Sequence, residues 1–276
     1  MKKILTIILG LLSILSFTSC KKENTKVDVM SSFYAIDSVV NSLVKDTNIT
    51  TDCLVKGTAE PHEYEPSVKD VAKLYDAKVI IFNGNDFEEF GNNLNNDILD
   101  KVVEVSDYLD VIPSDPHTFV SPKTMLKVVE VIKNTLIEIF SDYSEVINNN
   151  YLAYYKELEE LDKKYDEFFE SNQNKYVVSH DAYKYFARDY NLIIKSVLGM
   201  HEEEPTARAI TEIEKYITTN NIKEIYGAHF EENEIVNKIA SDLNLKVKLL
   251  YTGEMMDESN LDYLEITRKN LDIFRS

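Results

Sequence analysis

The sequence predicts an α/β protein of two lobes, each a mainly parallel sheet flanked by helices, joined by a long rigid helix. In both halves of the 276-residue chain, short apolar runs that suit buried strands alternate with amphipathic segments of helical period. Between the halves, residues 141–171 carry Tyr, Leu and Phe at three- and four-residue steps among Lys, Glu and Asp. No Gly or Pro occurs between Pro122 and Gly199, so the middle third lacks a flexible linker.

The first 19 residues are interpreted as a secretion signal and excluded from the fold. Two lysines precede an apolar run that ends at Phe17 and is short for a membrane span. Phe-Thr-Ser-Cys at 17–20 resembles a lipobox, in which cleavage leaves Cys20 to carry lipid at the start of a polar tether, residues 20–26. A cleaved signal without lipid is the alternative. We expect an extracytoplasmic protein, lipid-anchored to the bacterial cell membrane.

The N-terminal lobe is expected to span residues 27–140. Its apolar runs alternate with helical patterns, which predicts a parallel sheet with helices on both faces. The expected strands are residues 27–30, 50–55, 78–82 and 101–105. The expected helices are residues 34–45, 67–75, 87–94 and 123–140.

Residues 141–171 are expected to form the linking helix, with Ser141 or Asp142 as its cap. At about 1.5 Å per residue it would be roughly 40 Å long, enough to join two lobes. A charged surface helix or half of a coiled coil would show the same pattern, but similar α/β patterns on both sides favour the linking role. Its expected buried face is Tyr151, Tyr155, Leu158, Leu161, Tyr165 and Phe168.

The C-terminal lobe, residues 172–276, is expected to repeat the scheme of the first. Its expected strands are residues 176–180, 192–197, 222–226 and 246–251. Its expected helices are residues 182–190, 209–219, 233–244 and 263–274.

Charge argues against a nucleic-acid-binding protein, and cysteine content argues against a fold held by disulfides. The formal net charge is −18 and becomes −20 without the signal, which carries only Lys2 and Lys3. Such an acidic protein repels phosphate, so nucleic acid is not an expected partner. With Cys20 used for the anchor, only Cys53 remains, and the mature protein has no internal disulfide.

Three of the five histidines follow expected strands. His62 comes after the second strand, His117 after the fourth, and His180 ends the first strand of the second lobe. The carboxyl ends of strands in open parallel sheets face the ligand crevice, so these imidazoles could converge from both lobes. One such histidine is more often a hydrogen-bonded structural residue. Three at equivalent positions favour a metal site, because neutral imidazole is a common metal ligand.

Several motifs resemble, in order and spacing, the zinc-binding solute-binding lipoproteins of metal ABC importers. They are Phe33-Tyr34, LVKGTAEPHEYEPS at 54–67, DPHTFVSP at 115–122, VVSHDAYKYFARDYNL at 177–192 and EPT at 204–206. The resemblance covers essentially the whole mature chain. It implies a two-lobed fold with a rigid helical backbone and a monomer that delivers Zn²⁺ to an ABC importer permease. It also implies that His62, His117 and His180 are ligands.

The fourth ligand depends on the turn after the last strand. Many members of the family place Asp where this chain has Gly253, whereas a zinc-specific subgroup has Glu one position later, which is Glu254. Glu254 is therefore the expected ligand, with Asp257 or water as alternatives. Side chains that could hydrogen-bond to the ligands without binding the ion themselves are Glu60, His229 and Asp257. His201 is expected on the surface.

Three imidazoles and one carboxylate suit tetrahedral Zn²⁺ and are poor for Mn²⁺, which prefers more oxygen ligands. An Mn²⁺-binding protein of the same type is one alternative. From other classes, a zinc metallohydrolase and an adhesive lipoprotein remain. The common HExxH spacing of zinc hydrolases is absent from the sequence, which argues against an enzyme. The sequence also has no P-loop, so the ATPase is expected on a separate chain.

Overall fold

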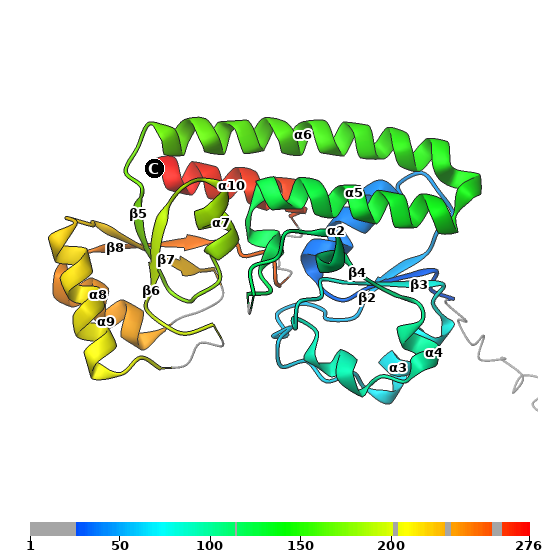
Figure 1. Cartoon of the computed structure of the whole chain (residues 1–276), viewed down its shortest axis with the longest axis horizontal. Helices are drawn as coiled ribbons and strands as arrows, with labels where there is room; N and C mark the ends of the chain where they lie inside the picture. The colour runs from blue at the N-terminus through cyan, green and yellow to red at the C-terminus, as the bar shows by residue number, and fades with distance from the viewer. Residues whose placement is uncertain (1–25, 114, 201–203, 230–232, 256–260) are drawn as a thin grey trace, which may run out of the picture.

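Two parallel sheets of four strands each form the two lobes of the protein (Figure 1). The computed structural model describes residues 26–113, 115–200, 204–229, 233–255 and 261–276. A long helix runs along one side of both lobes (Figure 1). The predicted fold class is thereby confirmed.

The strands of the two sheets follow the same order. The first sheet is ordered β2-β1-β3-β4 and the second β6-β5-β7-β8, and every pairing is parallel. The strands are β1 (Val29–Ser31), β2 (Thr51–Cys53), β3 (Val79–Phe82), β4 (Val102–Glu104), β5 (Lys175–Val178), β6 (Ile193–Ser196), β7 (Glu224–Ala228) and β8 (Lys246–Leu250). In each sheet the second strand of the chain lies on one side of the first strand and the third lies on the other side. The order of the strands therefore reverses at the first strand. Such a switch point opens a crevice at the carboxyl ends of the strands.

Helices of the N-terminal lobe are fixed by local signals. A capping box of Ser67 and Asp70 starts α3, and Ser121 caps α5, whose first residue is a proline. The α-helices are α2 (Tyr34–Leu43), α3 (Val68–Asp76), α4 (Asn96–Leu99) and α5 (Pro122–Ile139). The helix expected at residues 87–94 is instead the 3₁₀ helix η1 (Glu89–Asn93). Gly91 and the two asparagines that follow it are poor helix formers, which explains the difference.

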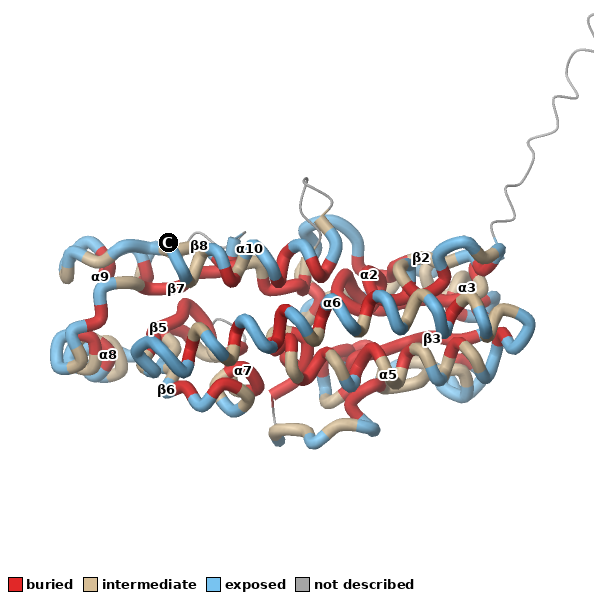
Figure 2. Tube along the Cα trace, turned by 90° about the horizontal axis from the view of Figure 1, so that it is seen from above, coloured by how far each residue is buried: buried red, intermediate tan, exposed pale blue. Residues whose placement is uncertain are grey.

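The linking helix is α6 (Ser144–Glu170), which packs on α2, α5 and α10. It begins later than expected, because residues 141–143 form the separate 3₁₀ helix η4, and its cap is Tyr143 rather than Ser141 or Asp142. One face of it is buried and the opposite face is exposed, so the colours alternate within each turn (Figure 2). Of the expected buried face, Leu158, Leu161 and Tyr165 are buried. Tyr151, Tyr155 and Phe168 are only half-buried at the border of the stripe, and Tyr154 and Phe169 are buried instead.

A second helix also connects the lobes. The first turns of α10 (Tyr263–Arg275) belong to the hydrophobic core of the N-terminal lobe, and Leu271 belongs to a core of the C-terminal lobe. Tyr263 anchors the start of α10 in the first lobe, since its backbone N–H donates to Ser38 Oγ (2.8 Å) and its hydroxyl donates to the Phe119 carbonyl (2.7 Å). Figure 1 shows α10 lying beneath α6. Two helices therefore hold the lobes together.

The C-terminal lobe has separate apolar clusters on the two faces of its sheet. One is packed with rings from α6, α7 (Lys184–Asp189) and α10. The other holds aliphatic side chains of α8 (Ala207–Thr219) and α9 (Glu234–Leu243). Within the described part of the chain, no helix combines the length and the apolar character needed to cross a bilayer.

Candidate metal centre

Four candidate ligand residues lie in the loops that follow strands. His62 follows β2, His117 follows β4, His180 follows β5 and Glu254 follows β8. The first two come from the N-terminal lobe and the last two from the C-terminal lobe. All of them therefore sit at the carboxyl edge of a parallel sheet, where the sequence places the crevice.

Three of these residues bring their ligand atoms together. Ligand atoms of His62, His117 and Glu254 all lie within 4.8 Å of one another. His62 Nε2 is 3.2 Å from His117 Nε2, and Glu254 Oε1 is 3.5 Å from that same nitrogen. Zinc bonds of about 2.0–2.1 Å at tetrahedral angles put neighbouring ligand atoms about 3.3 Å apart. The two measured separations bracket that value, so the arrangement fits a tetrahedral ion.

Asp115 determines which nitrogen of His117 can bind a metal. Both residues are completely buried, and His117 Nδ1 lies 2.8 Å from Asp115 Oδ1. An ionised carboxylate only accepts hydrogen bonds, so the proton of the neutral ring is on Nδ1. The lone pair is then on Nε2, which faces His62 and Glu254. A carboxylate behind a metal-binding histidine is a common arrangement that orients the ring and raises its basicity.

Glu254 is a buried carboxylate with an open coordination position. Its side chain is 2% exposed, and Thr252 Oγ1 donates to its Oε2 over 3.3 Å. No described residue donates a hydrogen bond to Oε1, because its approach to His117 lacks hydrogen-bond geometry. A buried charged oxygen without a donor is costly unless a cation binds it. The preceding Gly253 has φ +87°, a conformation that favours glycine and turns the chain toward the site.

Aromatic rings form one wall of the site. The ring of Phe87 meets that of His62 edge-on at 4.6 Å between centroids, and Phe119 approaches His117 at 5.9 Å. Phe33 packs against both phenylalanines at 4.5 and 4.7 Å. All three phenylalanines are fully buried, so this side of the site excludes water.

His180 lies beside the three clustered residues without joining them. It is 3% exposed, and its ring centroid is 5.9 Å from that of His117 and 6.3 Å from that of Tyr183. It is not among the residues whose ligand atoms lie within 4.8 Å of one another. The structure therefore places His180 next to the site, but not within 4.8 Å of all three ligand atoms.

The remaining sequence candidates lie in different places. Glu60 Oε1 accepts a hydrogen bond from the His62 backbone N–H (3.2 Å), so it shapes that loop. His229 is exposed and stacks on Tyr251 with 4.3 Å between ring centroids. Asp257, His201 and Cys20 lie outside the described residues.

Two asparagines that the sequence analysis did not single out hold the His117 loop. Asn83 Nδ2 donates to the Pro116 carbonyl (2.7 Å), and its Oδ1 accepts from Thr118 Oγ1 (2.5 Å). Asn85 Nδ2 donates to the Asp115 carbonyl (2.5 Å). Their position directly after an apolar strand was a signal in the sequence, because that is where residues at the carboxyl edge of a sheet are found.

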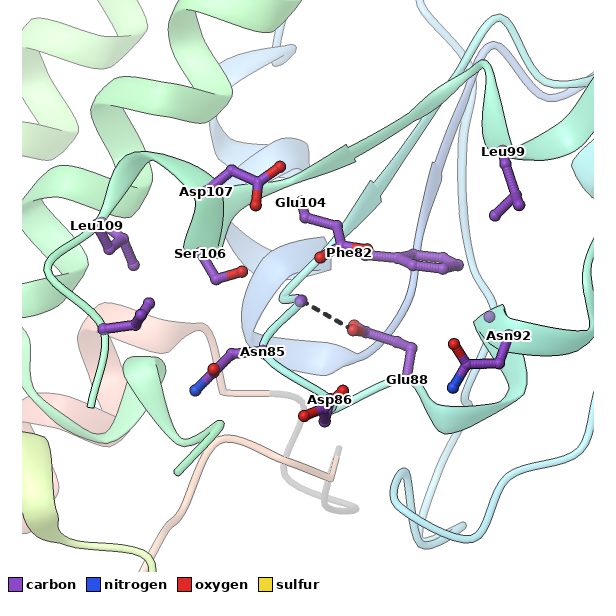
Figure 3. A pocket seen from close by; sticks show the side chains of 13 residues that line it. Phe82, Asn85, Asp86, Glu88, Asn92, Leu99, Glu104, Ser106, Asp107 and Leu109 are labelled. Carbon is purple, nitrogen blue, oxygen red and sulfur yellow. Dashed lines mark hydrogen bonds between the residues drawn. The ribbon is translucent and has the colours of Figure 1, made fainter. Parts of the chain in front are cut away.

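A polar cavity of about 780 Å³ opens at the ends of β3 and β4 (Figure 3). Its acidic lining residues are Asp86, Glu88, Glu104 and Asp107. Glu88 accepts hydrogen bonds from the backbone N–H groups of Asn83 and Gly84, and loss of hydration raises the pKa of its carboxyl to about 7. None of the four candidate ligands lines this cavity, so it is separate from the metal centre.

Comparison with known proteins places the chain in a sequence family. Residues 29–276 match the family described as zinc-uptake complex component A, periplasmic. The zinc-binding lipoprotein AdcA of Streptococcus pneumoniae (strain ATCC BAA-255 / R6) is 29% identical over 98% of this chain and 60% of its own length. The high-affinity zinc uptake system protein ZnuA of Bacillus subtilis (strain 168) is 25% identical over 93% of this chain and 89% of its own. The chain thus spans about three fifths of AdcA.

Solved structures show the same architecture. The laminin binding protein Lmb of Streptococcus agalactiae, described as a bifunctional protein with adhesin and metal transporting activity, aligns with a TM-score of 0.83. It is 27% identical, with 90% of this chain and 98% of the other covered. The Zn(II)-bound ZnuA-like domain of Streptococcus pneumoniae AdcA aligns with a TM-score of 0.77 at 28% identity, covering 91% and 98%.

Proposed function

Because the chain belongs to the zinc-uptake complex component A family, we propose that it captures Zn²⁺ outside the cytoplasmic membrane and delivers it to an ABC importer permease. The observation that carries this proposal is the convergence of His62 Nε2, His117 Nε2 and Glu254 Oε1 at separations suited to one tetrahedral ion. The names of the similar proteins, a zinc-binding lipoprotein and a zinc uptake protein, support the same conclusion.

We assign four ligands to the ion: His62, His117, His180 and Glu254. The first, second and fourth are supported by the distances between their ligand atoms. His180 is supported by its burial beside His117 and by the family resemblance of the segment that contains it. Three nitrogens and one oxygen favour Zn²⁺ over Mn²⁺, which needs more oxygen ligands. Glu254 then occupies the position that an activated water would need in a hydrolase.

The direct test is metal analysis of residues 27–276 followed by competition titration. We expect one tightly bound Zn²⁺ per chain and much weaker binding of Mn²⁺. Affinity for Zn²⁺ should fall as the pH is lowered, because imidazole binds metal only in its neutral form. A chain without a tight zinc site, or one that prefers Mn²⁺, would show that the proposal is wrong.

We also propose that the mature protein is a monomer, anchored to the membrane by lipid on Cys20. The support is the lipobox-like sequence at residues 17–20, followed by a polar tether. Changing Cys20→Ala should block processing or move the protein out of the membrane fraction. Detergent phase partitioning of both forms tests this, and a wild-type protein that partitions as soluble would contradict it.

Adhesion is a second candidate function, favoured by the structural similarity to the laminin binding protein Lmb. Surface plasmon resonance on immobilised laminin would measure it directly. Binding that saturates at micromolar concentrations or below would support adhesion, and no binding above that to albumin would exclude this ligand.

A further inference from the structure

The loop that presents His117, described at residues 110–113 and 115–121, is held by a helix of the other lobe. That helix is α7 (Lys184–Asp189), which begins four residues after His180 and packs on α5 and η3 (Thr118–Val120). The segment that carries His117 and the segment that carries His180 therefore also contact each other at a place away from their imidazole rings.

Tyr185 makes the central contact. This residue of α7 is completely buried, and its hydroxyl uses both of its hydrogen-bonding roles on the loop. The hydroxyl accepts from the Ile112 backbone N–H (3.0 Å) and donates to the Asp115 carbonyl (3.1 Å). Asp115 is the residue whose carboxylate orients His117. The Tyr185 hydroxyl thus fixes the backbone of Asp115, and the carboxylate of Asp115 in turn orients the ring of His117.

Further contacts from α7 hold the two ends of the loop. Asp189 Oδ2 accepts from Ser121 Oγ and Thr124 Oγ1, each at 2.6 Å, where the loop enters α5. Arg188 donates to the Asp110 carbonyl (2.8 Å) at the other end. The side chain of Asp189 is only 8% exposed, so its two hydrogen bonds are partly shielded from water and count for more than the exposed one made by Arg188.

We infer that Tyr185 is a positioning residue for the metal site: its hydroxyl sets the position of His117 relative to His180 before the ion arrives. This inference rests on the proposed function. A site whose ligands are already placed spends less of its binding free energy on ordering loops, so the contact raises zinc affinity without touching the metal.

The test compares two tyrosines of the same helix region in the mature protein. Tyr185→Phe removes only the hydroxyl that holds the loop. Tyr190→Phe is the matched control: Tyr190 is buried and follows α7 directly, but its hydroxyl donates to Asp162 of α6 (2.9 Å). Three measurements are made on each: thermal unfolding without metal, Zn²⁺ competition titration, and the visible absorption of the Co²⁺-loaded protein, which reports coordination geometry.

Tyr185→Phe should weaken Zn²⁺ binding by about tenfold, the lower end of the loss typical for a direct partner of a metal ligand, because Tyr185 acts on His117 only through Asp115. It should also alter the Co²⁺ bands. Tyr190→Phe should lower the unfolding temperature but leave Zn²⁺ affinity within about twofold and the Co²⁺ bands unchanged. Equal effects of the two changes on metal binding, or none from Tyr185→Phe, would overturn the inference.

Two further outcomes are separated by the same design. If Tyr185→Phe does not fold, Asp189→Asn takes its place: it weakens a different contact of α7 with the same loop, at Ser121 and Thr124, and has the same expected and contrary results. If the wild-type protein binds neither Zn²⁺ nor Co²⁺, the proposed function fails and this inference fails with it. If the wild type binds both and the variants match it, this inference alone is wrong.

Discussion

At the scale of single residues, the site depends on which ring nitrogens of its two contacting histidines carry protons. The proton on His117 Nδ1 is committed to Asp115, which leaves Nε2 to face the site. Without metal, the 3.2 Å contact between the two Nε2 atoms requires His62 to donate its proton to His117. Binding an ion therefore requires the neutral His62 ring to move that proton to its other nitrogen. Protons that compete for the same imidazole nitrogens couple ion binding to pH.

Asp115→Asn should weaken Zn²⁺ binding by about 10- to 100-fold while leaving the fold intact. An amide is a poorer acceptor than a carboxylate, so His117 becomes less basic and less firmly oriented. Competition titration measures the change, and Asp110→Asn, which alters an exposed carboxylate of the same loop, is the control. Equal affinities for the Asp115 and Asp110 variants would show that Asp115 has no such role.

Glu254→Gln should keep the three nitrogens but remove the only anionic ligand, weakening Zn²⁺ binding by about tenfold, or ~1.4 kcal/mol. His180→Ala should cost more, because it removes a proposed nitrogen ligand from the second lobe. Asp257→Asn tests the competing carboxylate and should have no effect. If Asp257→Asn lowers the affinity and Glu254→Gln does not, the assigned ligand is off by three residues; if neither matters, water holds the fourth position.

At the scale of secondary structure elements, buried charge in α2 gives the lobe a pH-dependent stability. Asp37 lies in the first turn of α2 and is 7% exposed, and Asn41 Nδ2 donates to its Oδ2 (2.8 Å). Loss of hydration is the main cause that raises the pKa of this carboxyl from 3.8 to about 6. The folded state therefore favours the protonated form.

Because the pKa is higher in the folded state, the stability that Asp37 contributes is present below about pH 4 and is lost as the pH rises through about 6. The loss is about 3 kcal/mol at most. Asp37→Asn cannot ionise, so the free energy of unfolding of the variant relative to wild type should increase by up to that amount between pH 4 and 7.5. Urea unfolding of the metal-free proteins measures it. A difference that stays constant with pH would contradict the prediction.

At the scale of the whole molecule, two helices and one loop contact resist movement of the lobes. Both α6 and α10 contribute to the cores of the two lobes, and α7 holds the His117 loop across their boundary. Binding proteins that close on their ligand need a hinge that absorbs backbone rotation. The described residues between Pro122 and Gly199 offer neither glycine nor proline for one. Metal binding is therefore expected to act on the loops around His62 and Glu254.

Small-angle scattering with and without Zn²⁺ tests this rigidity. The radius of gyration should be the same in both states within the precision of the measurement, because only loops change. Apo-protein prepared with a chelator and then reloaded serves as the control for damage. A clear compaction on loading would show that the lobes close and that the two connecting helices bend.

The sequence by itself determined the alternation of strands and helices, the linking helix, and the placement of His62, His117 and His180 after strands. These features follow from residue period and turn chemistry, which are local. Only the tertiary structure decided the role of α10 in both lobes, the pairing of Asp115 with His117, and the hold of Tyr185 on the loop. It also decided which residues border the buried face of α6, whose centre at Leu158, Leu161 and Tyr165 was predicted from the sequence. The contacts of α10 and Tyr185 join residues far apart in the chain, so they exist only once the two lobes have packed against each other. Asp115 and His117 are only two residues apart, but they pair because the folded loop buries both side chains.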